Sequence, residues 1–198
     1  AALMANDPDY VRNLMAEPNE ALRRAFLEGD WSIFAGQYFA DFRRELHVLP
    51  AEFKIEPWWT RFGGYDHGYF HPYLFGAFAS DGDGNVYMYS EVGGRGRNLT
   101  QIADEIHAVC PEVNGMTIWA GHDCWSVQRD GGPTIHEQFA GMGAKRLNLV
   151  KADISRISGA TQVRTYLAPN KDGNPKLYLL ENCRHTIECL PRMIHDTN

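Results

Sequence analysis

Apolar and polar positions divide the chain into a helical beginning and a strand-rich remainder. Residues 1–48 favour two short helices followed by an extended segment, with a break at Pro18 and a helix end at Gly29. We interpret residues 1–50 as a helical connecting arm from a missing neighbouring domain, which joins domains and adds nothing to the core. The domain itself is expected over residues 51–198.

Short apolar runs with flanking turn residues predict strands from about residue 58 onward. The expected strands cover residues 58–66, 72–80, 85–91, 116–123 and 146–150, with a further extended run at 176–181. The second and third runs are joined by DGDGN, a turn sequence that strongly favours a hairpin.

A spacing of three to four residues between apolar positions predicts helices between the later strands. Residues 98–110 place their apolar side chains on one face, and Asn98 is a suitable N-cap. Thr134 and Glu137 form a capping-box pattern at the start of the next helix. Further helical segments are expected at 154–168 and 183–190.

The order of these elements predicts an α/β fold with a mixed β-sheet flanked by helices. The first three strands form an antiparallel meander. The fourth and fifth strands are reached through helices and are expected to run parallel to the first.

Composition and charge narrow the class of protein. The chain has 198 residues, 44% hydrophobic and 22% charged, and this composition is typical of one globular domain. Its formal net charge of -6 disfavours nonspecific binding of nucleic acid over the whole surface but allows a local basic groove. No apolar run reaches membrane-spanning length and no signal peptide is recognisable, so we expect a cytoplasmic protein. The sequence also has no P-loop motif, so we expect no ATP hydrolysis of the P-loop kind.

Two aspartates come at the ends of predicted strands. Asp66 ends the first strand and Asp123 ends the fourth. If these parallel strands are neighbours, both carboxylates converge at one edge of the sheet, where ligands usually bind. A pair of carboxylates there suits Mg²⁺ or Mn²⁺, and two such ions can activate water and stabilise the leaving oxygen of a phosphodiester. An aspartate close to glycine is equally typical of a turn, and for the pair the two interpretations stay open.

The order of the motifs resembles the nuclease domain of bacteriophage terminase large subunits. The resemblance begins with Asp66, His67, Gly68 and Pro72, and continues through the hairpin DGDGNVYMYSE and the helix NLTQIADEI. It then follows the family's later segments: TIHEQFAGMG, KADISRISGATQVRTYL and NPKLYLLENCRHTIECLP. The sequences LEGDW and GQYF in the arm resemble the stretch that joins the family's ATPase domain to its nuclease.

This resemblance implies an RNase H-like fold and a metal-dependent endonuclease that cuts double-stranded DNA during viral genome packaging in the host cytoplasm. The first and second acids of the family match Asp66 and Asp123, with Mg²⁺ or Mn²⁺, two ions in all, as cofactor. The implied partners are double-stranded DNA, a terminase ATPase domain, a small terminase subunit and the portal. The family's third acid is expected beyond Asn198, although Asp196 is an alternative.

Four basic residues are candidate DNA contacts. Arg95 and Arg97 lie in the glycine-rich loop GGRGRN, through which a phosphate backbone can approach closely. Lys151 and Arg156 follow the fifth strand, where a helix and a loop would form one wall of a groove.

Two other functions are also compatible with the sequence. One is a junction resolvase or integrase-like nuclease with the same fold, and branched DNA substrates would distinguish it. The other is a non-catalytic module that docks on DNA or portal, which would have no need for metal affinity.

Overall fold

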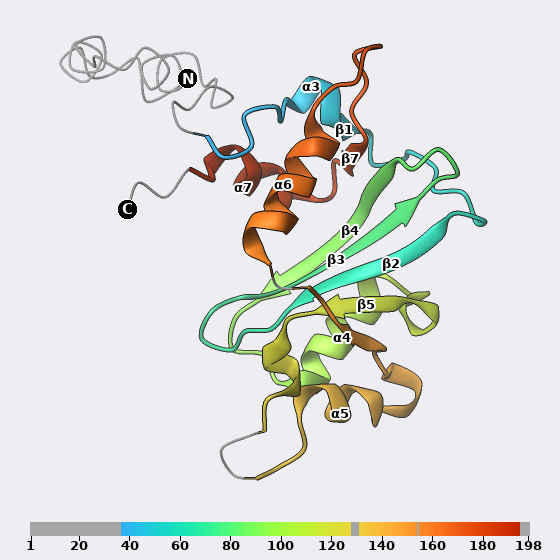
Figure 1. The fold of residues 1–198 in the computed structure, drawn as a ribbon. Helices are drawn as coiled ribbons and strands as arrows, with labels where there is room; N and C mark the ends of the chain where they lie inside the picture. The colour runs from blue at the N-terminus through green and yellow to red at the C-terminus, as the bar shows by residue number, and fades with distance from the viewer. Residues whose placement is uncertain (1–36, 128–130, 154, 195–198) are drawn as a thin grey trace, which may run out of the picture.

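A seven-stranded sheet forms the centre of the computed structural model, which describes residues 37–127, 131–153 and 155–194 (Figure 1). The strand order is β1-β7-β4-β3-β2-β5-β6. The strands are β1 (Val48–Leu49), β2 (Thr60–Asp66), β3 (Tyr73–Ser80), β4 (Val86–Gly94), β5 (Thr117–Ala120), β6 (Leu149–Lys151) and β7 (Leu177–Leu180). The two helices expected before Gly29 lie outside the described residues.

Strand directions confirm the predicted mixed sheet. β2, β3 and β4 form the antiparallel meander, with Asp66 opposite Leu74 at the end of β2. β5 pairs in parallel with β2, and β6 in parallel with β5. β4, β7 and β1 are also joined in parallel. Six strands of this sheet therefore run in one direction, and β3 runs against them.

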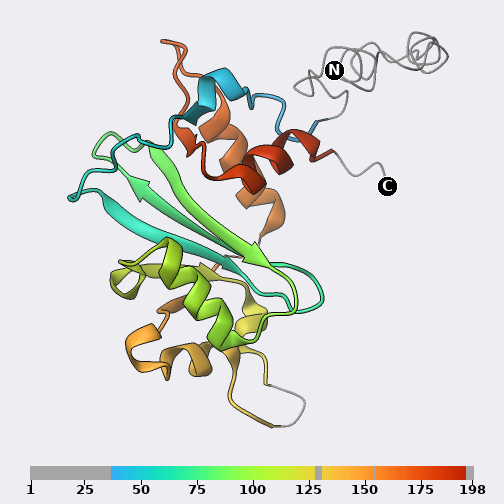
Figure 2. The same ribbon diagram turned by 180° about the vertical axis from the view of Figure 1, so that it is seen from behind.

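Helices cover both faces of the sheet (Figures 1 and 2). Five α-helices are described: α3 (Arg44–His47), α4 (Leu99–Val109), α5 (Ile135–Ala140), α6 (Arg156–Leu167) and α7 (Arg184–Cys189). Short 3₁₀ turns are η1 (Val113–Gly115), η2 (His122–Trp125), η3 (Gly143–Lys145) and η4 (Leu190–Arg192). Within the described residues, no helix has both the length and the apolar character needed to span a bilayer.

Two helix starts confirm the capping predictions. Asn98 accepts a hydrogen bond from the Gln101 amide, and the Gln101 side chain accepts one from the Asn98 amide. Thr134 and Glu137 form the same reciprocal pair at α5. Each cap satisfies backbone N–H groups that the first helical turn leaves unpaired, so these short sequences determine where α4 and α5 begin.

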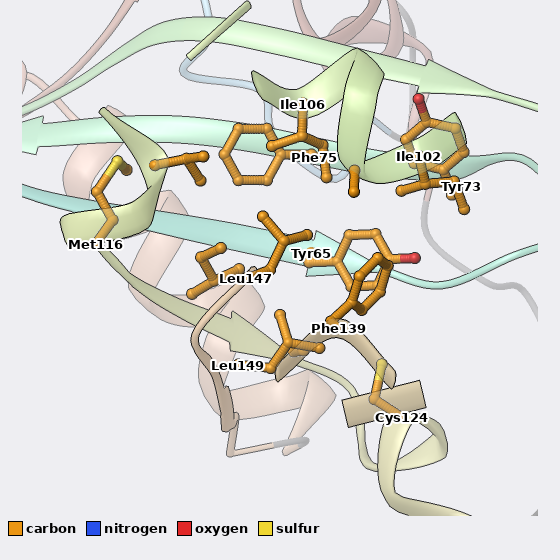
Figure 3. Packing of buried hydrophobic residues seen from close by; sticks show 14 of the residues in the cluster. Tyr65, Tyr73, Phe75, Ile102, Ile106, Met116, Cys124, Phe139, Leu147 and Leu149 are labelled. Atoms are coloured by element: carbon orange, nitrogen blue, oxygen red, sulfur yellow. The ribbon is translucent and has the colours of Figure 1, made fainter. Parts of the chain in front are cut away.

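The larger core lies between the sheet and helices α4 and α5 (Figure 3). Alternate residues of the strands point to this face, as a strand period of two requires. Tyr65, Phe75 and Ile118 contribute from β2, β3 and β5, while Ile106 and Phe139 contribute from the helices. This packing fixes β2 against β5, the two strands that lead to the candidate acids.

The opposite face of the sheet packs against α6, α7 and the chain before β1. Met88 and Leu179 meet Leu167 and Ile187 in this second core. Aromatic side chains from the chain before α3 are buried in it as well, namely Phe39 and Phe42.

The end of the expected arm, residues 37–49, therefore packs as part of the domain. β1 adds a parallel edge strand beside β7, and the segment before it supplies core side chains. This differs from an arm that only connects domains. The physical reason is that its apolar side chains cover sheet surface that α6 and α7 leave open.

Candidate active site

The parallel strands bring their carboxyl ends to a single edge of the sheet. Charged residues lie at or just after the ends of five of these strands. Asp66 ends β2, and Asp123 comes three residues after β5. Lys151 ends β6. Arg95 follows β4, and Arg184 begins α7 shortly after β7. This edge therefore combines two acids with three cations, although these residues are far apart in the sequence.

Asp66 and Asp123 lie within electrostatic reach of each other. β2 and β5 are adjacent, with Tyr65 opposite Ala120 at the last register position. Burial raises the pKa of Asp66, and the negative charge of Asp123 raises it further. Both carboxylates also raise the pKa of the Cys124 thiol, after burial, to about 12. The two acids therefore share one region of negative potential at this edge.

The position of Asp123 differs from the prediction in one respect. The fourth strand was expected to continue to residue 123, but β5 ends at Ala120 and η2 follows. Gly121 starts this turn, with its carbonyl accepting a hydrogen bond from the Cys124 amide at 3.2 Å. An ideal Cβ on Gly121 would lie 2.7 Å from Asp123 Oδ1, so glycine leaves the space that the carboxylate occupies.

Neighbouring groups hold the turn that carries Asp123. His122 Nε2 donates a hydrogen bond to the Ala152 carbonyl at 3.0 Å, and the Ala152 amide donates to Ala120 O at 2.9 Å. Cys124 is fully buried in the main core. The turn is thus attached to the chain after β6 on one side and to the core on the other, which restricts where the carboxylate of Asp123 can lie.

His67 lies beside the acids and is tied to the core. Its Nδ1 is hydrogen-bonded to the Tyr65 hydroxyl at 2.8 Å. Burial lowers the pKa of His67, although Asp123 and Asp66 both act in the opposite direction. Its hydrogen bond to Tyr65 therefore helps to fix the end of β2.

The acid pair fits a magnesium-type ion in its donor chemistry. Within residues 37–127, 131–153 and 155–194, neither the Asp66 carboxylate nor the Asp123 carboxylate accepts a hydrogen bond or forms an ion pair. No cluster of three or more His, Cys, Asp or Glu side chains suited to a metal ion occurs in that part of the chain. Mg²⁺ is commonly held by one or two carboxylates together with water and substrate phosphates, so these two carboxylates could hold one such ion.

Glu91 has a structural role in the described fold. Its carboxylate accepts hydrogen bonds from the His185 amide at 2.5 Å, the Thr186 amide at 3.2 Å and the Thr186 hydroxyl at 2.7 Å. These residues lie in the first turn of α7, so Glu91 caps that helix from a distant strand.

A cleft of about 630 Å³ opens beside Asp66. Arg95, Asn182, Arg184 and His185 are among its lining residues. The sequence pointed to Arg95 but not to Arg184, because residue 184 comes close to Asp66 only when β7 pairs with β4. No local spacing in the sequence signals that contact.

The other predicted DNA contacts have different surroundings. Arg97 Nε donates to Glu105 at 2.5 Å, so part of its charge is already paired. The Lys151 ammonium lies 5.5 Å from the ring centroid of Trp125, which in turn stacks on His136. Arg156 is the first residue of α6, and its side chain is outside what the structure describes.

Comparison with solved structures identifies the fold. The nuclease domain of the P22 large terminase matches with a TM-score of 0.61 and 16% identity, over 81% of this chain and 80% of that one. The large terminase nuclease of thermophilic phage G20c with bound cobalt matches at 0.56 and 14% identity, over 84% and 85%. A large terminase from another thermophilic bacteriophage, solved in complex with ADP, matches at 0.63 and 14% identity, over 98% of this chain and 46% of that one.

These matches confirm that the chain has the RNase H-like fold of phage large terminase nuclease domains. It corresponds to less than half of the large terminase solved with ADP. No protein-family model matches the sequence, and no curated protein does. At these identities the likeness establishes the fold alone.

Proposed function

We propose that this chain is a metal-dependent endonuclease that cuts double-stranded DNA during packaging of a viral genome. The observation that carries the proposal is the pair Asp66 and Asp123 at the carboxyl edge of β2 and β5, whose carboxylates have no hydrogen bond or ion pair among the described residues. Like charges held close together are unfavourable, and a divalent cation between them would remove that cost.

In this proposal Asp66 and Asp123 hold Mg²⁺ or Mn²⁺. When bound, two such ions activate water for attack on a phosphodiester and stabilise the leaving oxygen. The chain's own contribution is position: β2 fixes Asp66, and the η2 turn, attached to Ala152 through His122, fixes Asp123. The nuclease of phage G20c has been solved with bound cobalt and with bound zinc, which supports a metal site in this fold.

The cations at the same edge suit a phosphate backbone. Arg95 and Arg184 line the cleft beside Asp66, and Lys151 ends the strand next to β5. Arg97 and Arg156 would add contacts on the flanking loop and helix. A chain with net charge -6 binds DNA only where such cations are gathered locally, which favours one defined groove over a diffuse surface.

The proposed setting is a packaging motor in the host cytoplasm. The large terminase that was solved with ADP is more than twice as long as its segment that aligns with this chain. We therefore propose a terminase ATPase domain, a small terminase subunit and the portal as partners. A third acid beyond residue 198 would complete the metal ligands in this proposal.

A plasmid-cutting assay tests the activity. The chain is incubated with supercoiled plasmid and Mn²⁺, and we expect weak, nonspecific nicking and linearisation. Asp66→Asn should reduce the rate of plasmid cutting by more than about a hundredfold. That is more than the loss of activity usually seen when a residue that only supports the metal ligands is changed. Asp83→Asn is the matched control because Asp83 is exposed in the β3–β4 turn, at the opposite edge. Equal cutting by wild type and Asp66→Asn would refute the assignment.

A docking module is the second candidate, supported by the absence of a third ligand among the described residues. Calorimetric titration with Mn²⁺ separates the two functions. Heat of binding that disappears in Asp66→Asn supports the nuclease, whereas DNA binding without any metal binding supports the docking module. A preference for four-way junctions over linear duplex would instead indicate a resolvase.

A further inference from the structure

Two aromatic side chains are exposed on the loop that immediately follows Asp66. Phe70 is 87% exposed and Tyr69 is 54% exposed. Their rings contact each other edge to face, with centroids 5.2 Å apart. Phenylalanine is usually buried, so an aromatic pair held in solvent beside a candidate active site needs an explanation.

The loop holds this pair in a defined place. Gly68 is buried in the turn, and a Cβ there would lie 2.7 Å from Pro72 O and closer still to His71 O. The Gly96 amide donates a hydrogen bond to the Tyr69 carbonyl at 2.9 Å, which ties the loop to the one that follows β4. These two contacts restrain the loop backbone, so less backbone freedom is lost when Phe70 binds a partner.

The position of Phe70 relates it to the acid pair. It comes four residues after Asp66, so their Cα atoms are at most about 14 Å apart even in a fully extended chain. Base pairs are spaced by about 3.4 Å, so this reach covers about four base steps. Gly96, whose amide binds the Tyr69 carbonyl, directly follows Arg95, and Arg95 also lines the cleft beside Asp66. In both views the loop after β2 extends beyond the end of the sheet (Figures 1 and 2).

We propose that Phe70 inserts between adjacent base pairs of duplex DNA, within about four steps of the phosphate presented to Asp66 and Asp123. This inference rests on the proposed function. Apolar wedges unstack base steps and kink DNA, and stacking on a ring is tolerant of sequence because every base has a π-face. Tyr69 acts as a positioning residue, since its edge-to-face contact and its held carbonyl support the Phe70 ring. Arg95, in the neighbouring loop, neutralises a phosphate that the kink brings closer.

The test uses the full chain and duplex oligonucleotides that carry 2-aminopurine, whose fluorescence rises when a base is unstacked. With EDTA present, wild type should bind without cutting and raise the fluorescence. Phe70→Ala should remove this rise and weaken duplex binding by about tenfold, as expected for one lost stacking contact. Phe70→Trp should restore the signal because it keeps an aromatic face. Trp58→Ala is the matched control, since Trp58 is 77% exposed but precedes β2 at the opposite edge.

The outcomes distinguish this inference from the nuclease proposal. A fluorescence rise that depends on Phe70, in a chain that fails to cut with Mn²⁺, supports insertion and refutes the nuclease. Normal Mn²⁺-dependent cutting with equal fluorescence in wild type and Phe70→Ala overturns insertion and leaves the nuclease standing. If Phe70→Ala weakens binding of single-stranded DNA only, or if wild type does not bind duplex DNA, insertion is also overturned. Phe70 is exposed, so Phe70→Ala should unfold at the same temperature as wild type.

Discussion

Gly121 lies against the carboxylate of Asp123, so closely that a Cβ on Gly121 would be 2.7 Å from Asp123 Oδ1. The backbone of Gly121 has φ -60° and ψ 155°, which any residue adopts. Alanine at this position would therefore leave the turn intact and displace the flexible carboxylate. The glycine serves the position of one side chain, not the conformation of the chain.

We expect Gly121→Ala to fold normally and to weaken Mn²⁺ binding by about tenfold, the order seen when a neighbour of a metal ligand is changed. Calorimetric titration measures the affinity, and thermal unfolding in EDTA checks the fold. Gly115→Ala is the control, because no atom lies within 4 Å of a Cβ built there. Equal Mn²⁺ affinity in the two variants would show that Asp123 is not a ligand.

The raised pKa of Asp66 predicts how stability depends on pH. Because the folded-state pKa is above the ordinary value of 3.8, the folded protein holds this proton more tightly than the unfolded chain does. The resulting stabilisation is present below pH 3.8 and is lost as pH rises through the folded-state pKa. In EDTA, wild type should therefore lose stability relative to Asp66→Asn as the pH rises from 3.8 through the folded-state pKa of Asp66.

Urea unfolding from acidic to neutral pH, in EDTA, measures this difference. Asp66→Asn should be the more stable protein at neutral pH, because it carries neither the repulsion nor the partly desolvated charge. Added Mn²⁺ should stabilise wild type alone. A difference between the two proteins that stays constant with pH would contradict the raised pKa.

Glu91 gives a test that separates a helix cap from a metal ligand. Glu91→Ala removes the acceptor for two amides and one hydroxyl at the start of α7. We expect a loss of about 1–2 kcal/mol in the free energy of unfolding, as for other lost N-caps, with unchanged Mn²⁺ affinity. Glu188→Ala, on the exposed side of the same helix, should have little effect on either quantity. Lost Mn²⁺ affinity without lost stability would indicate that Glu91 is a ligand.

Arg95 and Arg97 are two residues apart but should differ in DNA binding. Arg95 lines the cleft beside Asp66, whereas Arg97 is paired with Glu105. Arg95→Ala should reduce the slope of log affinity against log salt concentration by about one, which corresponds to one lost phosphate contact. Arg97→Ala should change it less. Fluorescence anisotropy with a labelled duplex in EDTA, over a series of salt concentrations, measures both, and equal slopes for all three proteins would remove Arg95 from the interface.

Local sequence was sufficient for much of the fold. The hairpin turn DGDGN and the capping residues Asn98 and Thr134 determined their elements, because turns and helix starts depend on hydrogen bonds between residues a few positions apart. The direction of β5 was also predictable, since a helix between strands favours a parallel crossover. The end of β5 was predicted three residues too late because an apolar run does not show where pairing stops.

Only the tertiary structure decided which distant residues meet. The sequence offered Asp66 and Asp123 as strand-end acids, but the pairing of β2 with β5 brings them together. It gave no sign that Glu91 caps α7, that Arg184 joins the cleft, or that Phe39 and Phe42 complete a core. Such contacts depend on strand order and on the burial of whole faces. Those are properties of the assembled sheet. One arrangement is selected by many weak interactions summed over the sheet, and a local motif cannot select it.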